Sequence, residues 1–359
     1  MKVAIVHDWL ATNAGAEKVL RSLVNLYPDA DIFSLVDFLS DNDRDTIIDG
    51  KPVHTSFIQS LPFSKKQFRN YLPFFPKAIE SFDLSSYDLI ISSSWAVAKG
   101  VKKHKGQLHI SYCHTPIRYA WDLYEEYTNG LPWPKKGIVQ KILKYIRNWD
   151  TETLDRVDYF IANSKFVQER IQRIYNRDSI VIYPPVDISS FALGESKEDF
   201  YFTASRLVPY KKTKLIVEAF NHMPDRSLLV IGSGEELGSI QKIAKSNIKI
   251  LGYQSDDILI ETMQKAKAFV YAAVEDFGII PIEAMSCGTP VIALNKGGTK
   301  ETIVDKVTGI HFDEQNTASI IDAVEKFEKI DFDPYKIRQE AIKYTHFEEE
   351  LRTFITEVY

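Results

Sequence analysis

Residues 269–294 read FVYAAVEDFGIIPIEAMSCGTPVIAL and decide the fold class. The apolar run Phe269–Tyr271 is typical of a buried strand, and Val291–Leu294 is a second such run. Between them a glycine loop leads into a helical stretch near Ile280, with Pro281 in its first turn. The sequence Gly288-Thr289-Pro290 ends the helix. A strand, a helix and a second strand in this order predict a parallel sheet.

The same unit recurs along the chain, because short apolar runs alternate with longer stretches of helical period. The further runs are Val3–Val6, Leu89–Ile91, His109–Tyr112, Tyr159–Ala162, Ile180–Ile182, Phe200–Phe202, Leu228–Ile231 and Ile248–Leu251. Helical stretches such as Lys212–His222 and Asp256–Lys265 separate them. We therefore predict an α/β protein of two doubly wound, Rossmann-like domains that face an interdomain cleft.

The predicted domains span residues 1–183 and 184–344, joined at a turn-rich segment near residue 185. Residues 345–359 are amphipathic and are a candidate to pack back on the first domain. A length of 359 residues suits two domains, and 45% hydrophobic with 26% charged residues excludes disorder and a coiled coil.

The two cysteines, Cys113 and Cys287, exclude a disulfide framework and favour a reducing compartment, so we expect a cytoplasmic protein. The run Val3–Val6 is too short for a signal peptide. The sequence has no run of about 18 uninterrupted apolar residues, so no membrane-spanning helix is predicted.

Two glutamates flank the glycine loop of residues 269–294. Glu275 follows the strand and Glu283 lies about one turn into the helix, so both carboxylates can reach the strand-end cleft. Phe277, Gly278 and Ile279 would offer backbone N–H groups to an anion at the helix N-terminus. The alternative is a helix cap and a solvated glutamate, but the whole string favours a binding site.

A basic pair follows the first strand of the second domain. Arg206 and Lys211, five residues apart, can converge on a pyrophosphate, with Arg206 as a planar fork and Lys211 as a point charge. Such a pair can neutralise a departing diphosphate without a metal ion. Solvated surface charge is the alternative for each residue alone.

The loop 113–122 follows a strand of the first domain and reads CHTPIRYAWD. Its His114 and Asp122, with neighbouring aromatic side chains, suit the recognition of sugar hydroxyls and rings. Neither His nor Cys recurs at ligand spacing, so no zinc site is predicted. The acidic run Asp41–Asp45 is interpreted as a solvated loop.

Glycine turns add weaker evidence. Gly15 follows the first strand, and residues 232–234 and 297–298 follow later strands, where backbone can approach a phosphate or sugar closely. A tight turn alone would also explain each of them. The fingerprints of nicotinamide-binding folds and of Walker-type ATPases are absent.

These motifs together resemble the retaining glycosyltransferases of family 4, which have the GT-B fold. The resemblance rests on the pattern E-x7-E from Glu275 to Glu283 and on the string SRLVPYK at 205–211. It extends over essentially the whole chain. The strings YCHTPIRYAWD at 112–122 and EDFG at 275–278 further resemble mannosyltransferases that build bacterial surface polysaccharides from GDP-mannose.

The resemblance implies a role for each motif. Arg206 and Lys211 would hold the donor diphosphate, Glu283 the nucleotide ribose, and Glu275 would lie near the transferred sugar. The backbone of residues 277–279 would contact the sugar hydroxyls.

On the first domain, the resemblance implies that Gly15 approaches the diphosphate and that His114 faces the sugar from the acceptor side. Asp122 lies on the same acceptor-side loop. The family has Gly-Gly where this chain has Ala14-Gly15, which predicts a restricted φ angle at residue 14.

On the second domain, the backbone near Gly252 and Tyr253 is a candidate to recognise the nucleotide base.

The implied activity is sugar transfer with retained anomeric configuration, without a metal ion or other cofactor. The donor would be a nucleotide-sugar, with GDP-mannose as first choice, and the acceptor a glycan or polyprenyl-linked sugar. The alternatives are a UDP-sugar donor, a nucleotide-sugar epimerase or hydrolase of the same fold, and a non-catalytic sugar-binding protein.

The net charge of −5 is unevenly distributed, with 24 basic against 21 acidic residues in 1–178 and 20 against 28 in 179–359. Within the positive half, residues 135–147 place apolar side chains on one helical face between lysines. That pattern fits either a peripheral membrane contact at the inner face of the cell membrane or an ordinary core helix. Nucleic acid is not an expected partner.

Overall fold

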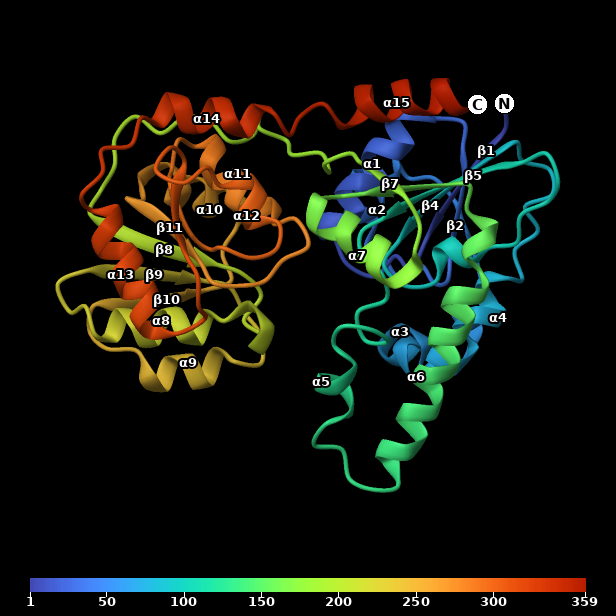
Figure 1. The fold of residues 1–359 in the computed structure, drawn as a ribbon, viewed down its shortest axis with the longest axis horizontal. Coiled ribbons are helices and arrows are strands. Elements are labelled where there is room, and N and C mark those ends of the chain that lie inside the picture. The colour runs from blue at the N-terminus through green and yellow to red at the C-terminus, as the bar shows by residue number, and fades with distance from the viewer. The chain divides into compact units, whose positions relative to one another are not determined.

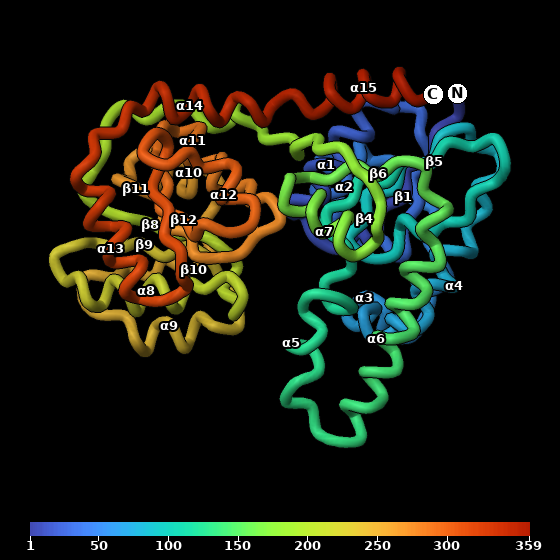
Figure 2. Tube along the Cα trace, viewed as in Figure 1, coloured from blue at the N-terminus to red at the C-terminus, as the bar shows by residue number.

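The computed structural model describes residues 1–359 and divides the chain into two compact units. Unit 1 comprises Met1–Pro185 with Phe347–Tyr359, and unit 2 comprises Val186–His346. The boundary therefore follows Pro185, whereas the first domain was predicted to end at residue 183. Figures 1 and 2 show a sheet flanked by helices in each unit, which is the predicted α/β class.

Unit 1 has a seven-stranded parallel sheet in the order β3-β2-β1-β4-β5-β6-β7. Its strands are β1 (Val3–His7), β2 (Asp31–Ser34), β3 (Val53–Thr55), β4 (Leu89–Ser94), β5 (Leu108–Cys113), β6 (Tyr159–Ala162) and β7 (Ser179–Val181). Its α-helices are α1 (Gly15–Leu26), α2 (Asp41–Ile48), α3 (Ser64–Gln67), α4 (Phe75–Ile79), α5 (Tyr124–Thr128), α6 (Lys135–Glu152), α7 (Lys165–Tyr175) and α15 (Phe347–Val358). Short 3-10 helices are η1 (Phe57–Ser60), η2 (Phe68–Phe74), η3 (Ala98–Gly100) and η4 (Leu154–Arg156).

Unit 2 has a six-stranded parallel sheet in the order β10-β9-β8-β11-β12-β13. Its strands are β8 (Phe200–Ala204), β9 (Ser227–Ile231), β10 (Ile248–Gly252), β11 (Ala268–Tyr271), β12 (Val291–Leu294) and β13 (Gly309–Phe312). Its helices are η5 (Pro209–Lys211), α8 (Thr213–Asn221), α9 (Leu237–Ile243), α10 (Asp256–Lys265), α11 (Ile279–Ser286), α12 (Thr299–Thr302), α13 (Thr317–Phe327) and α14 (Pro334–Ile342). In this unit α8 packs with α9 and α13, whereas α11 packs with α10 and α14.

The strand order creates a switch point in each sheet. In unit 1 the chain builds outward from β1 to β3 and then returns to place β4 on the other side of β1. In unit 2 it builds from β8 to β10 and then places β11 beside β8. Loops diverge at the carboxyl ends of such neighbouring strands, and ligands of open parallel sheets bind there.

Both faces of the unit 1 sheet are buried, which explains its continuous apolar strands. Alternate residues of β1 serve different cores, with Val3 and Ile5 packed toward α1 and α15 and with Ala4 and Val6 on the other face. The C-terminal helix α15 packs on this unit, where the Phe347 ring meets the Tyr112 ring edge-to-face at 5.5 Å.

Some elements differ from the sequence-based expectation. The run Asp41–Asp45 is not a loop but the start of α2, because Ser40 caps the helix by accepting the Asp43 N–H. Strands β2, β3 and β13 were not predicted. The φ angle of Ala14 is −145°, an extended conformation that its methyl group does not restrict, so the predicted restriction is wrong.

Candidate functional site

The switch point of unit 2 brings the two main sequence motifs into contact. Lys211 ends η5 after β8, and Glu275 follows β11. Lys211 Nζ lies 2.5 Å from Glu275 Oε1, and the Tyr271 hydroxyl donates to the same oxygen at 3.1 Å. Both charged side chains are largely buried, with 19% and 17% exposed. The contact therefore fixes a carboxylate and an ammonium group where the loops diverge.

Arg206 lies on the same strand-end loop but is exposed, and its side chain forms no ion pair. Backbone hydrogen bonds hold the loop itself. The Leu207 N–H donates to Ser233 O at 2.9 Å, and the Ser205 N–H donates to Ile231 O at 3.1 Å. A free guanidinium on an anchored loop suits the recognition of an incoming anion.

Glycines let these loops approach one another closely. A Cβ on Gly232 would lie 1.9 Å from Ser205 O, and one on Gly234 would lie 2.3 Å from Leu207 O. The Gly232 N–H in turn donates to Gly252 O at 2.8 Å. The loops after β8, β9 and β10 thus form one connected edge.

A second pair of glycines supports the Glu275 loop. The Gly298 N–H donates to Glu275 O at 2.8 Å, and a Cβ on Gly298 would lie 2.1 Å from Phe277 O. Gly297 has a φ of +76°, and a Cβ there would lie 2.4 Å from Glu275 O. The turn at 297–298, predicted only as a weak ligand contact, holds the loop that carries Glu275.

Helix α11 begins at this loop. Gly278 is its N-cap with a φ of +89°, and Ile279 is its first residue, one position before the predicted start near Ile280. Glu283 lies in the second turn and is 7% exposed, and Phe277 is buried with its ring edge-to-face on Tyr344 at 5.6 Å. The first N–H groups of α11 therefore follow directly on the Lys211–Glu275 contact.

Gly252 and Tyr253 lie at the end of β10, on the same edge of the sheet. Gly252 has a φ of +71° with open space around a hypothetical Cβ, and Tyr253 is 78% exposed. The structure brings them together with the loop at 232–234 through the Gly252 carbonyl.

In unit 1 the predicted acceptor-side residues lie after β5. His114 Nε2 is hydrogen-bonded to Ser93 Oγ at 2.8 Å, and its ring packs against Trp95 and Tyr112. Burial lowers the pKa of His114 to about 3, so the imidazole is neutral at pH 7. Gly15 is the first residue of α1, after β1.

Asp122 is engaged in ion pairs. It contacts Arg170 and also Arg173 Nη2, the latter at 3.0 Å, both on α7. Arg170 Nη1 donates to Thr115 Oγ1 at 2.6 Å, so it connects both ends of the loop 113–122. Asp122 therefore braces this loop, and the structure does not bring it into hydrogen-bond contact with His114.

A buried ion pair anchors the same loop from α6. Lys99 Nζ lies 2.8 Å from Asp150 Oδ1, and the Trp121 Nε1–H donates to Asp150 Oδ2 at 2.8 Å. Lys99 and Asp150 are 2% and 0% exposed. Buried charges need such partners, and here they order the loop that holds His114.

Asp8 was not predicted as a site residue. Asp8 follows β1 at the switch point, is fully buried, and accepts the backbone N–H groups of residues 95–98 at 2.6–2.8 Å. Burial raises the pKa of Asp8, whereas these hydrogen bonds oppose the rise. The sequence offered one indication of its role, namely its position directly after the first strand. Asp8 was interpreted only as the end of an apolar run.

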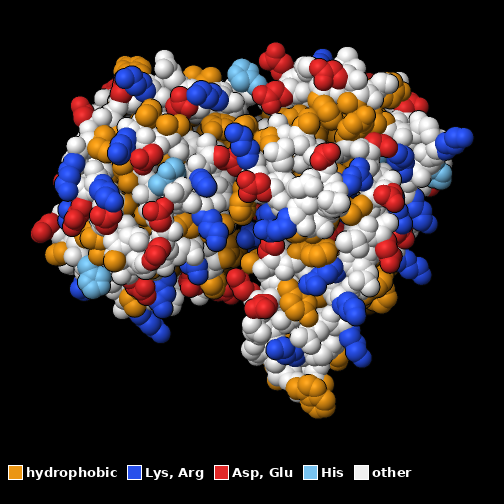
Figure 3. Space-filling model, in the orientation of Figure 1, with side chains coloured by type: hydrophobic (Ala, Val, Ile, Leu, Met, Phe, Trp, Pro, Cys, Tyr) orange, Lys and Arg blue, Asp and Glu red, His pale blue; other side chains and the backbone are white.

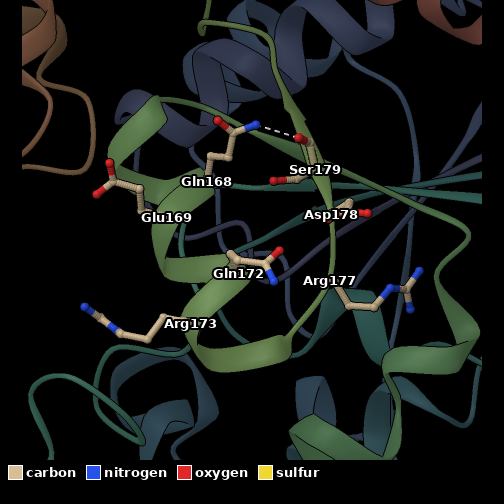
Figure 4. Close-up of a pocket in the computed structure, with 7 residues that line it drawn as sticks. All are labelled: Gln168, Glu169, Gln172, Arg173, Arg177, Asp178 and Ser179. Carbon is tan, nitrogen blue, oxygen red and sulfur yellow. Dashed lines mark hydrogen bonds between the residues drawn. The ribbon is translucent and has the colours of Figure 1, made fainter.

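A pocket of about 600 Å³ lies elsewhere, between α7 and β7. Figure 4 shows its lining, in which Gln168 donates to Ser179 O at 2.6 Å. None of the predicted site residues lines it. No group of three His, Cys, Asp or Glu side chains is arranged to hold a metal ion. None of the helices has the length and hydrophobicity needed to cross a membrane.

Comparisons with known proteins give a family match for each unit. Residues 14–190 match the family model described as Glycosyltransferase Family 4, and residues 186–346 match Glycosyl transferases group 1. Each of the two units therefore matches a glycosyltransferase domain model. The second model spans β8 to α14, which carry the Lys211–Glu275 contact.

Curated relatives of these glycosyltransferase domains are distant. D-inositol 3-phosphate glycosyltransferase of Mycobacteroides abscessus is 26% identical over 49% of this chain and 45% of its own length. Alpha-1,3/1,6-mannosyltransferase ALG2 of Mus musculus is 27% identical over 69% and 65%. The chain spans about half the length of the first curated relatives that it matches.

Solved structures share the fold. HepE of Anabaena in complex with UDP and glucose has a TM-score of 0.72 at 18% identity, covering 99% of this chain and 100% of that one. Sucrose-phosphate synthase of Thermosynechococcus elongatus has the same TM-score at 14% identity, covering 100% and 99%. The predicted fold class, two Rossmann-like domains of GT-B type, is confirmed.

Proposed function

We propose that this protein is a retaining, metal-independent hexosyltransferase that moves mannose from GDP-mannose to a glycan or polyprenyl-linked acceptor. The observation that carries the proposal is the Lys211–Glu275 contact beside the unpaired Arg206, at the carboxyl ends of β8 and β11. A nucleoside diphosphate needs cations at such a switch point. The hydroxyl groups of a sugar can donate hydrogen bonds to a carboxylate next to these cations, such as Glu275.

The leaving diphosphate develops negative charge as the glycosidic bond breaks. Arg206 and Lys211 stabilise this charge, and the first N–H groups of α11 add their dipoles. Glu283 binds the ribose hydroxyls, and Glu275 orients the transferred sugar. Catalysis is then positional and electrostatic, with attack on the same face as the departing diphosphate and no covalent nucleophile.

The choice of mannose is supported by two relatives. A GDP-mannose-dependent phosphatidylinositol monomannoside mannosyltransferase of Corynebacterium glutamicum is 35% identical over 28% of this chain and 30% of its own length. The mouse relative is also a mannosyltransferase by name. A UDP-sugar donor is the second candidate, since HepE of similar fold was solved with UDP-glucose.

A thermal-shift screen tests the donor first. GDP-mannose and GDP should raise the melting temperature more than UDP-glucose, UDP-N-acetylglucosamine and UDP do. Transfer to a glycan acceptor should proceed equally in EDTA and in added Mg²⁺. Fast turnover of donor without acceptor would instead indicate an epimerase or hydrolase.

The contact with an anionic membrane is a further part of the proposal. On α6 the predicted apolar face divides, because Leu143 and Ile146 are buried whereas Ile138 is 58% exposed. Trp133 precedes the helix and is 88% exposed. Figure 3 shows hydrophobic and basic side chains on the α5–α6 region of unit 1. An exposed aromatic side chain next to lysines suits a lipid interface.

Liposome flotation tests this contact. Trp133→Ala should reduce binding to vesicles that contain anionic lipid, and Tyr335→Ala is the control because Tyr335 is also exposed, at 71%, but lies on unit 2. Equal flotation of both variants at low salt would contradict the membrane contact.

A further inference from the structure

Four side chains connect the carboxyl ends of β1, β4 and β5 through the interior of unit 1. His7 Nδ1 is hydrogen-bonded to Ser93 Oγ at 3.1 Å, and Ser93 Oγ to His114 Nε2 at 2.8 Å. Glu17 Oε1, on α1, lies 3.8 Å from His7 Nε2. His7, Ser93 and Glu17 are 0%, 0% and 3% exposed, so water does not replace these partners.

The single hydroxyl proton of Ser93 couples the two imidazoles. Ser93 can donate to only one ring, and when it does so it accepts from the other. If Ser93 donates to His7 Nδ1, it accepts an N–H from His114 Nε2, and His114 Nδ1 carries no proton. If it donates to His114, then His114 Nδ1 carries the proton. The two arrangements present opposite hydrogen-bonding groups at His114 Nδ1.

Glu17 distinguishes the two arrangements. No hydrogen bond reaches His7 Nε2, and Glu17 supplies the carboxylate oxygen nearest to it. A carboxylate only accepts, and in a buried site it attracts an N–H and repels a nitrogen lone pair. The one ring proton of a neutral His7 therefore lies on Nε2, Ser93 donates to His7 Nδ1, and His114 is left with a bare Nδ1.

The surroundings hold both rings in place. The Trp95 ring lies edge-to-face against His7 at 4.9 Å and against His114 at 5.6 Å. The backbone N–H of His114 donates to Ser94 O at 2.9 Å. His114 is neutral at pH 7 because burial lowers its pKa to about 3, so the tautomer decides its chemistry.

We propose that Glu17, His7 and Ser93 are positioning residues that fix the tautomer of His114, so that its Nδ1 accepts a hydrogen bond from a substrate hydroxyl. The substrate part rests on the proposed sugar transfer. The tautomer part does not, because it follows from the buried contacts alone.

The wild-type protein tests the tautomer directly. In protein labelled with ¹⁵N-histidine and free of substrate, the ring nitrogens of His114 should show a protonated Nε2 and a bare Nδ1. The His114→Gln variant identifies the signal. A protonated Nδ1 in the wild-type protein would overturn the proposal without any variant having to fold.

Glu17→Gln should reverse the tautomer. The Ala14 N–H donates to Glu17 Oε2 at 3.0 Å. In the variant the same N–H would donate to the amide oxygen of the glutamine, so the NH₂ group would point toward His7 Nε2. Each proton in the chain then shifts, and His114 Nδ1 becomes protonated. The transfer reaction should lose about threefold to tenfold in kcat/KM, the size of one hydrogen bond.

Two further variants separate this effect from simple loss of structure. Ser93→Ala should give a mixture of His114 tautomers, because no proton fixes the ring. Glu80 contacts Trp149 and Arg156 and takes no part in the hydrogen bonds between Glu17 and His114. The carboxylate-to-amide change Glu80→Gln should therefore leave the His114 signal unchanged.

An unchanged His114 tautomer in Glu17→Gln would overturn the role of Glu17. A reversed tautomer with unchanged kcat/KM would overturn the contact with substrate. If no nucleotide-sugar supports transfer, the proposed function fails, yet the nitrogen signals still decide the tautomer.

Discussion

Lys211 Nζ lies 2.5 Å from Glu275 Oε1 and joins the loop after β8 to the loop after β11. The two residues are 64 positions apart in the sequence. The contact exists because β11 lies beside β8 in the sheet, although β9 and β10 intervene in the chain. It places a charge pair at the position where open parallel sheets bind ligands.

Removing either partner of this pair should cost stability and donor binding together. Lys211→Met leaves Glu275 with the Tyr271 hydroxyl, so we expect a loss of about 1–3 kcal/mol in the free energy of unfolding. Glu275→Gln and the double variant complete a cycle in urea denaturation, with a coupling energy of about 0.5–3 kcal/mol. Additive single effects would contradict a direct interaction.

Arg206→Ala should lower kcat by about 10²- to 10³-fold, because the guanidinium stabilises charge on the departing diphosphate. The melting temperature should hardly change, since the exposed side chain forms no ion pair. The control is Lys242→Ala on α9, which removes another exposed cation from the same unit. Near wild-type turnover in Arg206→Ala would refute the donor-site assignment.

Gly298→Ala should displace the Glu275 loop, because the new Cβ would meet Phe277 O at 2.1 Å. We expect a loss of about 1–3 kcal/mol in unfolding free energy and weaker stabilisation by nucleotide. Gly238→Ala on α9 is the control, since nothing lies within 4 Å of its Cβ. That variant should gain about 0.5–1 kcal/mol from helix propensity, and a thermal melt of both variants measures the contrast.

Unit 1 should lose stability as the pH falls below about 6.5. Burial lowers the pKa of His109 to about 4, and His114 behaves similarly. The unfolded chain binds these protons near pH 6.5 whereas the folded unit does not, so the stabilisation is full above 6.5 and lost toward pH 4.

Urea denaturation at intervals between pH 7.5 and 4.5 measures this dependence. Each of the two histidines contributes up to about 1.4 kcal/mol per pH unit. His109→Gln should reduce the slope, because glutamine does not titrate. A slope identical to that of the wild-type protein would show that His109 is not the responsible group.

Most strands that carry site residues were predictable, because fully buried parallel strands are continuous apolar runs. Strand β6 and helix α10 have the predicted bounds. Ala14 shows the limit of such reasoning, since its extended backbone depends on the Glu17 side chain that accepts its N–H.

The candidate site was predictable in part. Arg206, Lys211 and Glu275 could be proposed from strand-end position and charge, because a parallel sheet gathers its carboxyl ends at one edge. Asp122 shows what sequence could not provide. Its ion pairs with Arg170 and Arg173 depend on how α7 packs against the loop 113–122.

The sequence by itself determined the α/β class, the joint near residue 185 and the residues that carry charge after each strand. Those properties are local, since periodicity, turn residues and strand-end position can be read within a few residues. Only the tertiary structure decided which of these groups meet. The Lys211–Glu275 contact and the chain from Glu17 to His114 depend on strand order and burial, and burial in a low-dielectric interior gives these contacts their strength.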